Sequence, residues 1–575
     1  MKTRIAVLIT VAAASLSCQA DIANPADCGF AAVSGTFYVN TNEAFLNPGT
    51  GGAVQHTGVA IAANGNIIIG WENDGSAGIT DFEAVWTLYG PTGNLLTPPT
   101  VQTNRDVSGG GECGTTYEGI TNTWLAFFRS DNTAIGGYTG WGGFFPKGNR
   151  FGDGIGTAAM CWEIGLEIPE LLDINLASEP DEFPVVQLLN NDGTPFRPGV
   201  INGLTNLGIL TFTAEDVSPP GNIRGGDFDY LSDGNIVISG HSEQDADWVL
   251  TGQGCCYVPV YRIWTPGGQE VHGYAAASSE PIGGDMYRGV GVTANGFALR
   301  WTQNGGGSTM RLFDNAGNPT SADINLATLT GHPEVSQGGN GGGGDVANGN
   351  GFHGNGVDAY VYANSGGSPG TPWVTVINAD GTLRWSRKVQ DDSDPIDTSA
   401  VPDLDAAIDP SGRVIVVFSS PGLTNANDSI YNLTQARFFD QAGNPLGPRF
   451  VVSERENQAT EDANPFTVGP THEPRVAWRG NHVVFVWLSQ SSPTEYTGSD
   501  VVAARILAAP ITITSVSHSG TTTTINWTGG SPNYSLQRRS PLTGSWSTVQ
   551  TGITGNSTTY ADSATQAYYR VLCPQ

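Results

Sequence analysis

The amino-acid sequence predicts an all-β protein in which a ring of four-stranded sheets, a β-propeller, is followed by a small β-sandwich. The stretch "RFFDQAGNPLGPRFVV" at 437–452 is echoed by "RLFDNAGNPTSADINL" at 311, "TLYGPTGNLLTPPTVQ" at 87 and "TVINADGTLRWSRKVQ" at 375. Upstream of these echoes lie two short β-rich runs around an Asn-Gly or related turn, such as "VAIAANGNIIIGW", which is typical of a β-hairpin. No long window shows sustained helical periodicity.

The repeated unit reads as strand, tight turn, strand, variable loop, strand, tight turn at a recurring Gly, strand. About seven such units in 575 residues indicate a seven-bladed propeller. It becomes eight-bladed if residues 102–153 form a degenerate blade instead of the insertion that we favour. The recurring glycines are Gly93, Gly193, Gly268, Gly317, Gly381 and Gly443.

The two ends of the repeat region predict how the ring closes. The last unit stops after its third strand, before residue 508, and residues 34–41 ("SGTFYVNT") stand alone before the first hairpin. This segment is similar to the fourth-strand segment "LGPRFVVSE". We therefore expect a propeller over 21–507 in which 34–41 completes the last blade and leaves no long open edge.

Turn chemistry explains the recurring residues. Glycine adopts positive φ without a steric penalty, so each recurring Gly is expected between the third and fourth strands of a blade. The carboxylates near several of these glycines suggest calcium, but the turns are short and inconsistent, so we interpret them as turn residues. They are Asp192, Asp314, Asp380 and Asp440.

After Pro510 the composition shifts to Thr and Ser with alternating apolar residues, which predicts a β-sandwich over 508–575. Trp527, Tyr534 and Trp546 are expected to anchor its core. The strand spacing and the closing "YRV" resemble a fibronectin type III or related immunoglobulin-like module of bacterial secreted proteins.

The pattern of "RVIVVF" followed by "ARFFDQAGNPLGPRFVV" resembles repeats in large, poorly characterised secreted bacterial proteins. The resemblance covers most of 58–507. It implies a secreted or surface location and brings no known catalytic residues.

The N-terminus predicts export. Lys2 and Arg4 precede an apolar stretch over 5–16, and Cys18-Gln19-Ala20 offers a cleavage site, so residues 1–20 read as a signal peptide cleaved near Ala20. Lipidation of Cys18 is the weaker alternative, because Ser15 stands where a branched apolar residue is usual. No later segment has 18 unbroken apolar residues, so no membrane span is expected.

The charge of the chain excludes one class of partner. There are 25 Lys and Arg against 54 Asp and Glu, a net charge of −29. A surface this acidic repels phosphate backbones, which argues against nucleic acid.

Six cysteines follow the leader, and an even number in an exported protein suggests disulfides without fixing their connectivity. Cys255 and Cys256 bond either to each other or to two separate partners. The six are Cys28, Cys113, Cys161, Cys255, Cys256 and Cys573.

Function is expected on one face of the ring, where the long connections gather. Loops on a rigid scaffold carry binding and catalysis. The long segments are 102–153, 162–184, 200–226, 240–258, 328–352, 419–433 and 454–472. Their aromatic residues suit sugar rings, although packing in small cores beneath the loops is the alternative for each. They are Tyr138, Trp141, Phe144, Phe145, Trp162, Trp248 and Tyr274.

Acidic residues offer two further candidates. Glu243, Asp245 and Asp247 alternate after His241 as calcium ligands would, or else they form a solvated strand edge. A repeated Asp-x-Asp-x-x-x-Asp spacing is interpreted as strand and turn chemistry; it comprises Asp227, Asp229 and Asp233, and then Asp403, Asp405 and Asp409. No cofactor other than calcium is expected.

Common hydrolase motifs are absent, and Glu163, Glu167 and Glu170 are the carboxylates that would serve glycoside cleavage. The sequence thus predicts a secreted binding or adhesion protein that recognises glycans or a surface partner. The alternatives are a secreted polysaccharide-degrading enzyme, either a glycoside hydrolase or a lyase, and a structural surface or matrix protein.

Overall fold

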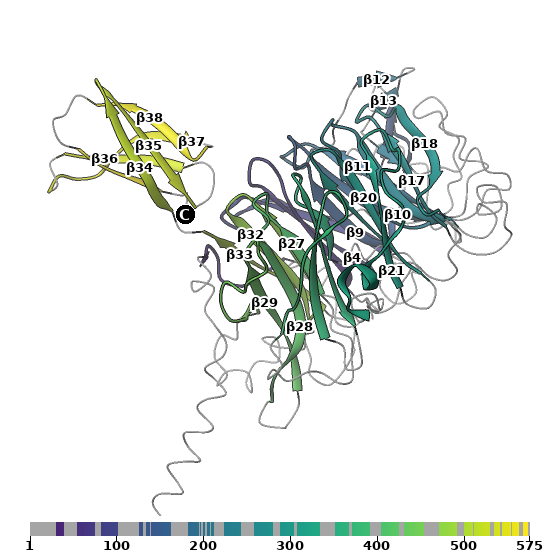
Figure 1. The fold of residues 1–575 in the computed structure, drawn as a ribbon. Coiled ribbons are helices and arrows are strands. Elements are labelled where there is room, and N and C mark those ends of the chain that lie inside the picture. Colours follow the sequence, from purple (N-terminus) through teal and green to yellow (C-terminus); the bar gives the residue numbers. More distant parts are fainter. Residues whose placement is uncertain are drawn as a thin grey trace, which may run out of the picture.

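In the residues that it describes, the computed structural model consists of β-strands and one short helix (Figure 1). It describes residues 30–39, 54–74, 82–101, 126–129, 134–137, 140–162, 182–194, 196, 199–201, 204–206, 209–211, 223–242, 258–279, 288–303, 307–333, 351–366, 371–390, 404–424, 430–453, 471–490, 500–509, 511–529, 534–540, 543–553, 555–562 and 567–572.

Six four-stranded antiparallel sheets follow one another along the chain. The first two contain β3 (Val54–Ile61), β4 (Ile67–Asp74), β5 (Phe82–Tyr89) and β6 (Leu95–Val101), then β9 (Gly140–Gly148), β10 (Ile155–Trp162), β11 (Glu182–Leu189) and β14 (Ile209–Thr211). The next two contain β15 (Ile223–Tyr230), β16 (Ile236–Ser242), β17 (Val258–Trp264) and β18 (Glu270–Ala276), then β19 (Arg288–Thr293), β20 (Gly296–Gln303), β21 (Gly307–Asp314) and β22 (Ile324–Asn325). The last two contain β23 (Phe352–Gly354), β24 (Ala359–Gly366), β25 (Thr371–Asn378) and β26 (Leu383–Lys388), then β27 (Leu404–Ile408), β28 (Val414–Thr424), β29 (Ile430–Phe439) and β30 (Phe450–Val451).

A further sheet joins the two ends of this region. Its strands β31 (Thr471–Arg479), β32 (His482–Gln490) and β33 (Asp500–Ala508) are completed by the N-terminal strands β1 (Ala31–Ala32) and β2 (Phe37–Tyr38). Phe37 lies opposite Ala504, and the Val39 N–H donates to the Val502 carbonyl at 2.8 Å. Residues 37–39 therefore occupy the fourth-strand position that the sequence left open.

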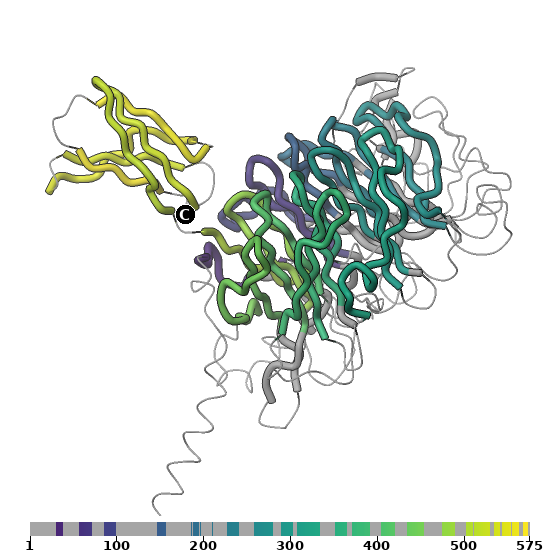
Figure 2. Tube along the Cα trace, in the orientation of Figure 1, coloured from purple at the N-terminus to yellow at the C-terminus, as the bar shows by residue number. Residues whose placement is uncertain are grey.

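The sheets are arranged around an axis with their first strands innermost. Strand β3 lies against β9, β9 against β15, and the contacts continue through β19, β23, β27 and β31 back to β3. Figure 2 shows the purple N-terminal strands beside the green strands that precede the C-terminal module. This is the arrangement of propeller blades.

The seam between the last and first sheets is a continuous apolar core. Val39, Ile67 and Trp71 pack in one buried cluster with Val484 and Ile506. The closing strand is therefore fixed by hydrophobic burial as well as by backbone hydrogen bonds.

Residues 102–153 divide into two parts. Residues Gly140–Gly148 of this segment form β9, the first strand of the second sheet. Upstream, β7 (Ala126–Arg129) and β8 (Ala134–Gly137) pair with β12 (Gly199–Ile201) and β13 (Leu204–Asn206) in a separate sheet.

The C-terminal module consists of two three-stranded sheets. One contains β34 (Thr512–Ser519), β35 (Thr522–Thr528) and β38 (Ser557–Ala561), and the other contains β37 (Ser547–Ile553), β36 (Tyr534–Arg539) and β39 (Tyr568–Leu572). Trp527 and Tyr534 are buried in its core, as predicted. Trp546 is not in that core: the prediction was wrong because its ring contacts the side chains of Arg539 and Arg570 instead.

The described helix is α4 (Leu326–Thr330), capped by the Asn325 side chain, which accepts from the Thr328 N–H. Within the described residues, no helix is long and apolar enough to span a membrane.

The recurring glycines have the predicted positive φ, between 79° and 87°. The nearby aspartates act as turn residues; for example, Asp440 accepts hydrogen bonds from the N–H groups of Ala442 and Asn444. At Gly443 a second constraint applies, because an added Cβ would lie 2.6 Å from the Trp385 ring.

We expect Gly443→Ala to lower the free energy of unfolding by about 2–4 kcal/mol, since it combines positive-φ strain with a clash against a buried ring. Gly234→Ala is the matched control: its φ is 90°, but nothing lies within 4 Å of an added Cβ, so it should cost only about 1 kcal/mol. Urea unfolding of both variants measures the difference, and equal losses would contradict the role of Trp385.

Candidate functional site

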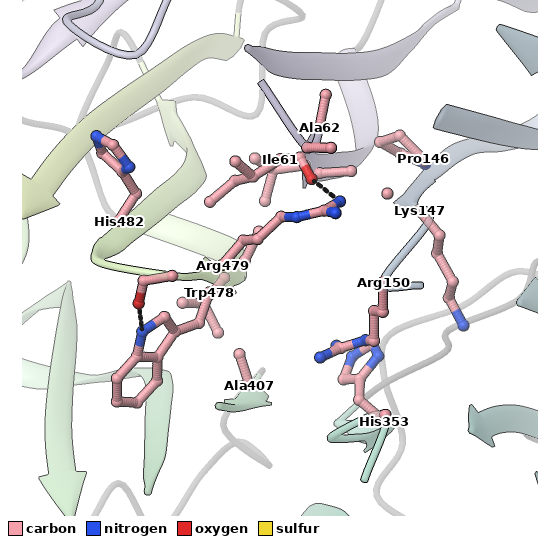
Figure 3. Close-up of a pocket in the computed structure, with 18 of the residues that line it drawn as sticks. Ile61, Ala62, Pro146, Lys147, Arg150, His353, Ala407, Trp478, Arg479 and His482 are labelled. Carbon is pink, nitrogen blue, oxygen red and sulfur yellow. Dashed lines mark hydrogen bonds between the residues drawn. The ribbon is translucent and has the colours of Figure 1, made fainter. Parts of the chain in front are cut away.

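A cavity of about 480 Å³ lies on the axis of the ring. Its wall is formed by the inner strands β3, β9, β15, β23, β27 and β31, by several of the short turns that follow them, and by Tyr534 and Asn556 of the C-terminal module (Figure 3). Apolar groups such as Ile61, Pro146 and Ala407 alternate there with charged side chains.

One of these charges, Asp227 on β15, joins three consecutive sheets. Its carboxylate accepts from the N–H of Phe228 on its own strand at 2.9 Å and from the N–H of Val290 on β19 at 2.7 Å. Lys147 on β9 pairs with it at 2.6 Å. Asp227 is 2% exposed, so these partners replace the water that burial removes.

Asp405 on β27 makes the same junction farther round the ring. It accepts from the N–H of Ala406 on its own strand at 2.8 Å and from that of Val476 on β31 at 3.0 Å. From the preceding sheet, the Gly351 N–H and the His353 ring contact it at 3.1 and 3.3 Å. Burial alone would raise the pKa of Asp405, but the hydrogen bond and charge of His353 and the positive charge of Arg475 hold that pKa below its usual value.

The register of the structure corrects the spacing noticed in the sequence. Asp227 and Asp405 are the equivalent residues, since each precedes the positive-φ glycine of its first turn by seven positions (227 to 234 and 405 to 412). The repeated spacing had aligned Asp227 with Asp403, which lies outside the described residues. Strand chemistry was the right interpretation of these carboxylates, but the motif is displaced by two residues.

Two guanidinium groups enter the cavity without a carboxylate partner. Arg150 Nη1 donates to the Ile408 carbonyl at 3.3 Å, and Arg479 donates to the carbonyls of Ile61 and Gly152, both at 3.2 Å. In the part of the chain that the structure describes, neither takes part in an ion pair. Burial lowers the pKa of Arg479 to about 10; the neighbouring charge of Arg150 contributes to that decrease, and the carboxylate of Asp153 opposes it.

Asp229 is a third carboxylate in the wall, and it differs from the other two. It is 2% exposed, and the Tyr230 N–H is its only recorded hydrogen-bond donor among the described residues. Burial raises the pKa of Asp229, although the charges of Lys147 and Arg150 oppose this. Asp229 is therefore the cavity carboxyl best suited to hold a proton.

The turn between β31 and β32 forms another part of the cavity wall. Trp478 is buried, and its Nε1–H donates to the Gly480 carbonyl at 3.1 Å. Asn481 reaches the C-terminal module by donating to the Tyr534 hydroxyl at 3.3 Å. Burial lowers the pKa of His482 to about 4.

The residues predicted from sequence largely fall elsewhere. Trp141, Phe144 and Phe145 lie on β9, Trp162 ends β10, Cys161 lies on β10, and Tyr274 is partly buried on β18. Outside the described residues lie the other aromatic candidates Tyr138 and Trp248, the carboxylates Glu163, Glu167, Glu170, Glu243, Asp245 and Asp247, and the cysteines Cys28, Cys113, Cys255, Cys256 and Cys573. These remain predictions.

Sequence reasoning missed the axial cations. No repeated spacing connects Arg479 with Lys147 and Arg150. One signal was present: basic residues are scarce in this chain, and Lys147 and Arg150 nevertheless lie three positions apart.

No protein-family model matches the chain, and no curated protein matches it. Among solved structures, it is similar to a protein of unknown function from Dyadobacter fermentans (12% identity, 84% of this chain and 100% of that chain, TM-score 0.34). It is also similar to an α-L-arabinofuranosidase from Fusarium graminearum (7%, 84% and 98%, TM-score 0.35) and an α-L-arabinanase from Penicillium chrysogenum (9%, 80% and 97%, TM-score 0.33). At TM-scores this low, the description of the fold rests on the sheets themselves.

We expect His482 to make the protein less stable in acid. Its folded-state pKa of about 4 lies below the unfolded value of 6.5, so the unfolded chain takes up the proton first as the pH falls. Stability should therefore decrease between pH 7 and pH 4, by up to about 3 kcal/mol from this group.

The comparison is urea unfolding of wild type and His482→Gln at pH 7, 5.5 and 4. The variant should lose less stability over this range, whatever its stability at pH 7. Parallel pH profiles for the two proteins would contradict a buried neutral imidazole.

Proposed function

We propose that the protein is a seven-bladed propeller that binds an acidic saccharide in its axial cavity, and that it acts outside the cell after cleavage near Ala20. The observation that best supports this proposal is that two partly buried guanidinium groups, those of Arg150 and Arg479, lie close together and donate to backbone carbonyls. The blade number is supported by the closed series of contacts from β3 to β31 and back.

The two cations stand in a chain that is rich in carboxylates. In a protein of net charge −29, carboxylates are abundant, yet these two cations have no ion pair within the described residues. Like charges held together in a low-dielectric wall repel each other. An incoming anion relieves that repulsion and gains charge-assisted hydrogen bonds, which Arg forms in a bidentate geometry with carboxylate or sulfate.

The volume of the cavity and the apolar residues in its wall favour a sugar that carries a carboxylate or sulfate group. A volume of about 480 Å³ suits a ligand of one or two sugar rings. Ile61, Pro146 and Ala407 offer apolar contacts for the C–H face of a ring. A saccharide with a carboxylate or sulfate substituent can contact both the guanidinium groups and the apolar residues of the wall.

This site differs in place from the one that the sequence suggested. The axial cavity reaches the short turns that follow the inner strands, whereas the sequence favoured the long connections; the aromatic candidates that the structure describes do not line the cavity. Glycan recognition through those connections remains a separate proposal, as does a structural role in a surface matrix.

We expect the double variant Arg150→Gln/Arg479→Gln to bind acidic disaccharides at least tenfold more weakly than wild type. Each lost charge-assisted hydrogen bond is worth about 1.5–3 kcal/mol. Isothermal titration with digalacturonic acid, a sulfated disaccharide, cellobiose, inorganic sulfate and inorganic phosphate distinguishes an acidic sugar from a free anion.

Arg384→Gln/Arg387→Gln is the control with the same change of charge, outside the cavity lining. It should leave the affinity within about twofold of wild type. Binding of sulfate or phosphate as tight as that of the disaccharides would contradict the saccharide, and binding of cellobiose alone would contradict the anion.

A second candidate function, cleavage of the bound saccharide, is favoured by Asp229. A buried carboxyl with a raised pKa beside the bound ligand is what a general acid requires. The other two carboxylates of the cavity wall, Asp227 and Asp405, already accept hydrogen bonds from backbone N–H groups. Glu163, Glu167 and Glu170 remain the proposed partners for such a reaction.

If the protein is a hydrolase, Asp229→Asn should reduce cleavage at least 100-fold and keep the affinity for the disaccharide, because Asn preserves the shape but holds no transferable proton. Asp233→Asn, in the turn after β15, is the control and should cleave normally. Size-exclusion chromatography of polygalacturonate incubated with each protein gives the readout. Intact polymer with wild type excludes hydrolysis of that substrate and leaves binding as its function.

A further inference from the structure

The outward face of one sheet in the C-terminal module carries an unusual set of side chains. In the sheet of β37, β36 and β39, Gln537 lies opposite Arg570, and Arg539 lies opposite Tyr568. Cross-strand partners project to the same side, so these four residues share one face. The intervening Leu536 and Val571 project to the other side and belong to the module core.

The outward residues form a stacked ladder around Trp546. The guanidinium groups of Arg539 and Arg570 lie 4.4 and 4.6 Å from the Trp546 ring centroid. Arg539 also lies 5.8 Å from the Tyr568 ring centroid. Arg570 donates from Nε and Nη2 to Gln537 Oε1 at 2.8 and 2.7 Å. Both guanidinium groups are thus held in place by rings and an amide.

No counter-ion accompanies these two cations within the described residues. Asp562 carries the single side-chain carboxylate of residues 511–575. It binds Arg538, which projects to the opposite side of the sheet, through two hydrogen bonds of 2.5 and 2.8 Å. Arg539 has no recorded hydrogen bond, and its Nε is shielded from solvent without an acceptor.

The charge of the module differs in sign from that of the rest of the chain. Residues 511–575 contain three Arg and one Asp, a net charge of 3 − 1 = +2, and the remainder has 22 − 53 = −31. Basic groups on a strongly acidic protein are a site to which anions are attracted.

We propose that this face, the Arg539–Trp546–Arg570 ladder, is a second binding site, and that its ligand is an extended anionic polysaccharide. Stacking on Trp546 orients the guanidinium groups, and the N–H groups that remain beyond those Arg570 donates to Gln537 and the buried Nε of Arg539 can bind carboxylate or sulfate. Because the two guanidinium groups lie on the surface of a sheet and not in a cavity, the ladder suits the repeated charges of a polymer, whereas the axial cavity suits one or two rings. The proposal does not depend on the axial cavity.

The experiment uses the full chain in the Arg150→Gln/Arg479→Gln background, so that the axial site does not contribute. Biolayer interferometry measures binding to immobilised chondroitin sulfate, polygalacturonate and neutral dextran at 50, 150 and 300 mM NaCl. Adding Arg539→Gln/Arg570→Gln should weaken binding to the two acidic polymers at least tenfold at 150 mM NaCl. Wild-type binding should decrease steeply with salt, because exposed charges are screened.

Arg387→Gln/Lys388→Gln removes the same charge from an exposed part of β26 and should change the affinity by less than twofold. An equal loss in this control would overturn the ladder in favour of net charge. Unchanged affinity in the ladder variant, or equal binding to dextran, would also overturn it.

The other occupant to consider is the acidic propeller of a second copy. If sedimentation velocity shows a wild-type dimer that the ladder variant loses, while polymer binding is unchanged, the face is a self-association surface and the proposal is wrong. Failure of the axial proposal is separate: there, disaccharide affinity stays unchanged in Arg150→Gln/Arg479→Gln, while the ladder result can still hold.

Discussion

The ring depends on two buried carboxylates that bind the backbone of their neighbours. Asp227 and Asp405 each accept an N–H from their own strand and another from the first strand of the next sheet. Each carboxylate also contacts a side chain of the preceding sheet: Lys147 pairs with Asp227, and His353 contacts Asp405. Inner strands at a propeller axis have no strand on their inner side, so their N–H groups need other acceptors. A carboxylate accepts several hydrogen bonds at once, so one side chain can serve as the acceptor for donors from three sheets.

The two buried carboxylates determine which charged side chains lie near the axis of the ring. Buried carboxylates require cations nearby, and Lys147 and Arg475 supply the compensating charge for Asp227 and Asp405. Arg150 and Arg479 form no ion pair among the described residues and donate to backbone carbonyls, although the charge of Arg150 also acts on the buried Asp229. Structural compensation therefore explains part of the positive charge in the cavity, and the proposal of an anionic ligand concerns the remainder.

The fold was predictable because its information is local. Strand alternation, the tight turns and the positive-φ glycines, such as Gly443, are properties of short segments, and their repetition revealed the blades. The closing segment around Phe37 was predictable for the same reason, as a strand missing at one end and present at the other. The axial site was not predictable, because Lys147, Asp227 and Val290 lie far apart in the sequence and meet only when three consecutive sheets pack together. Trp546 was misplaced because alternation does not say which of two faces an aromatic residue takes near the start of a strand.

The distribution of charge separates two demands on the same chain. A net charge of −31 outside the module favours repulsion between copies of this large surface. It also repels any acidic polymer, so a protein that binds one must concentrate its cations where they are shielded or held apart from that surface. The axial cavity does this by burial, and the C-terminal module does it by containing a single acidic side chain, which Arg538 occupies on the inner side. We propose an anionic ligand for both cation sites because, within the described residues, neither Arg539 nor Arg479 forms an ion pair with a carboxylate.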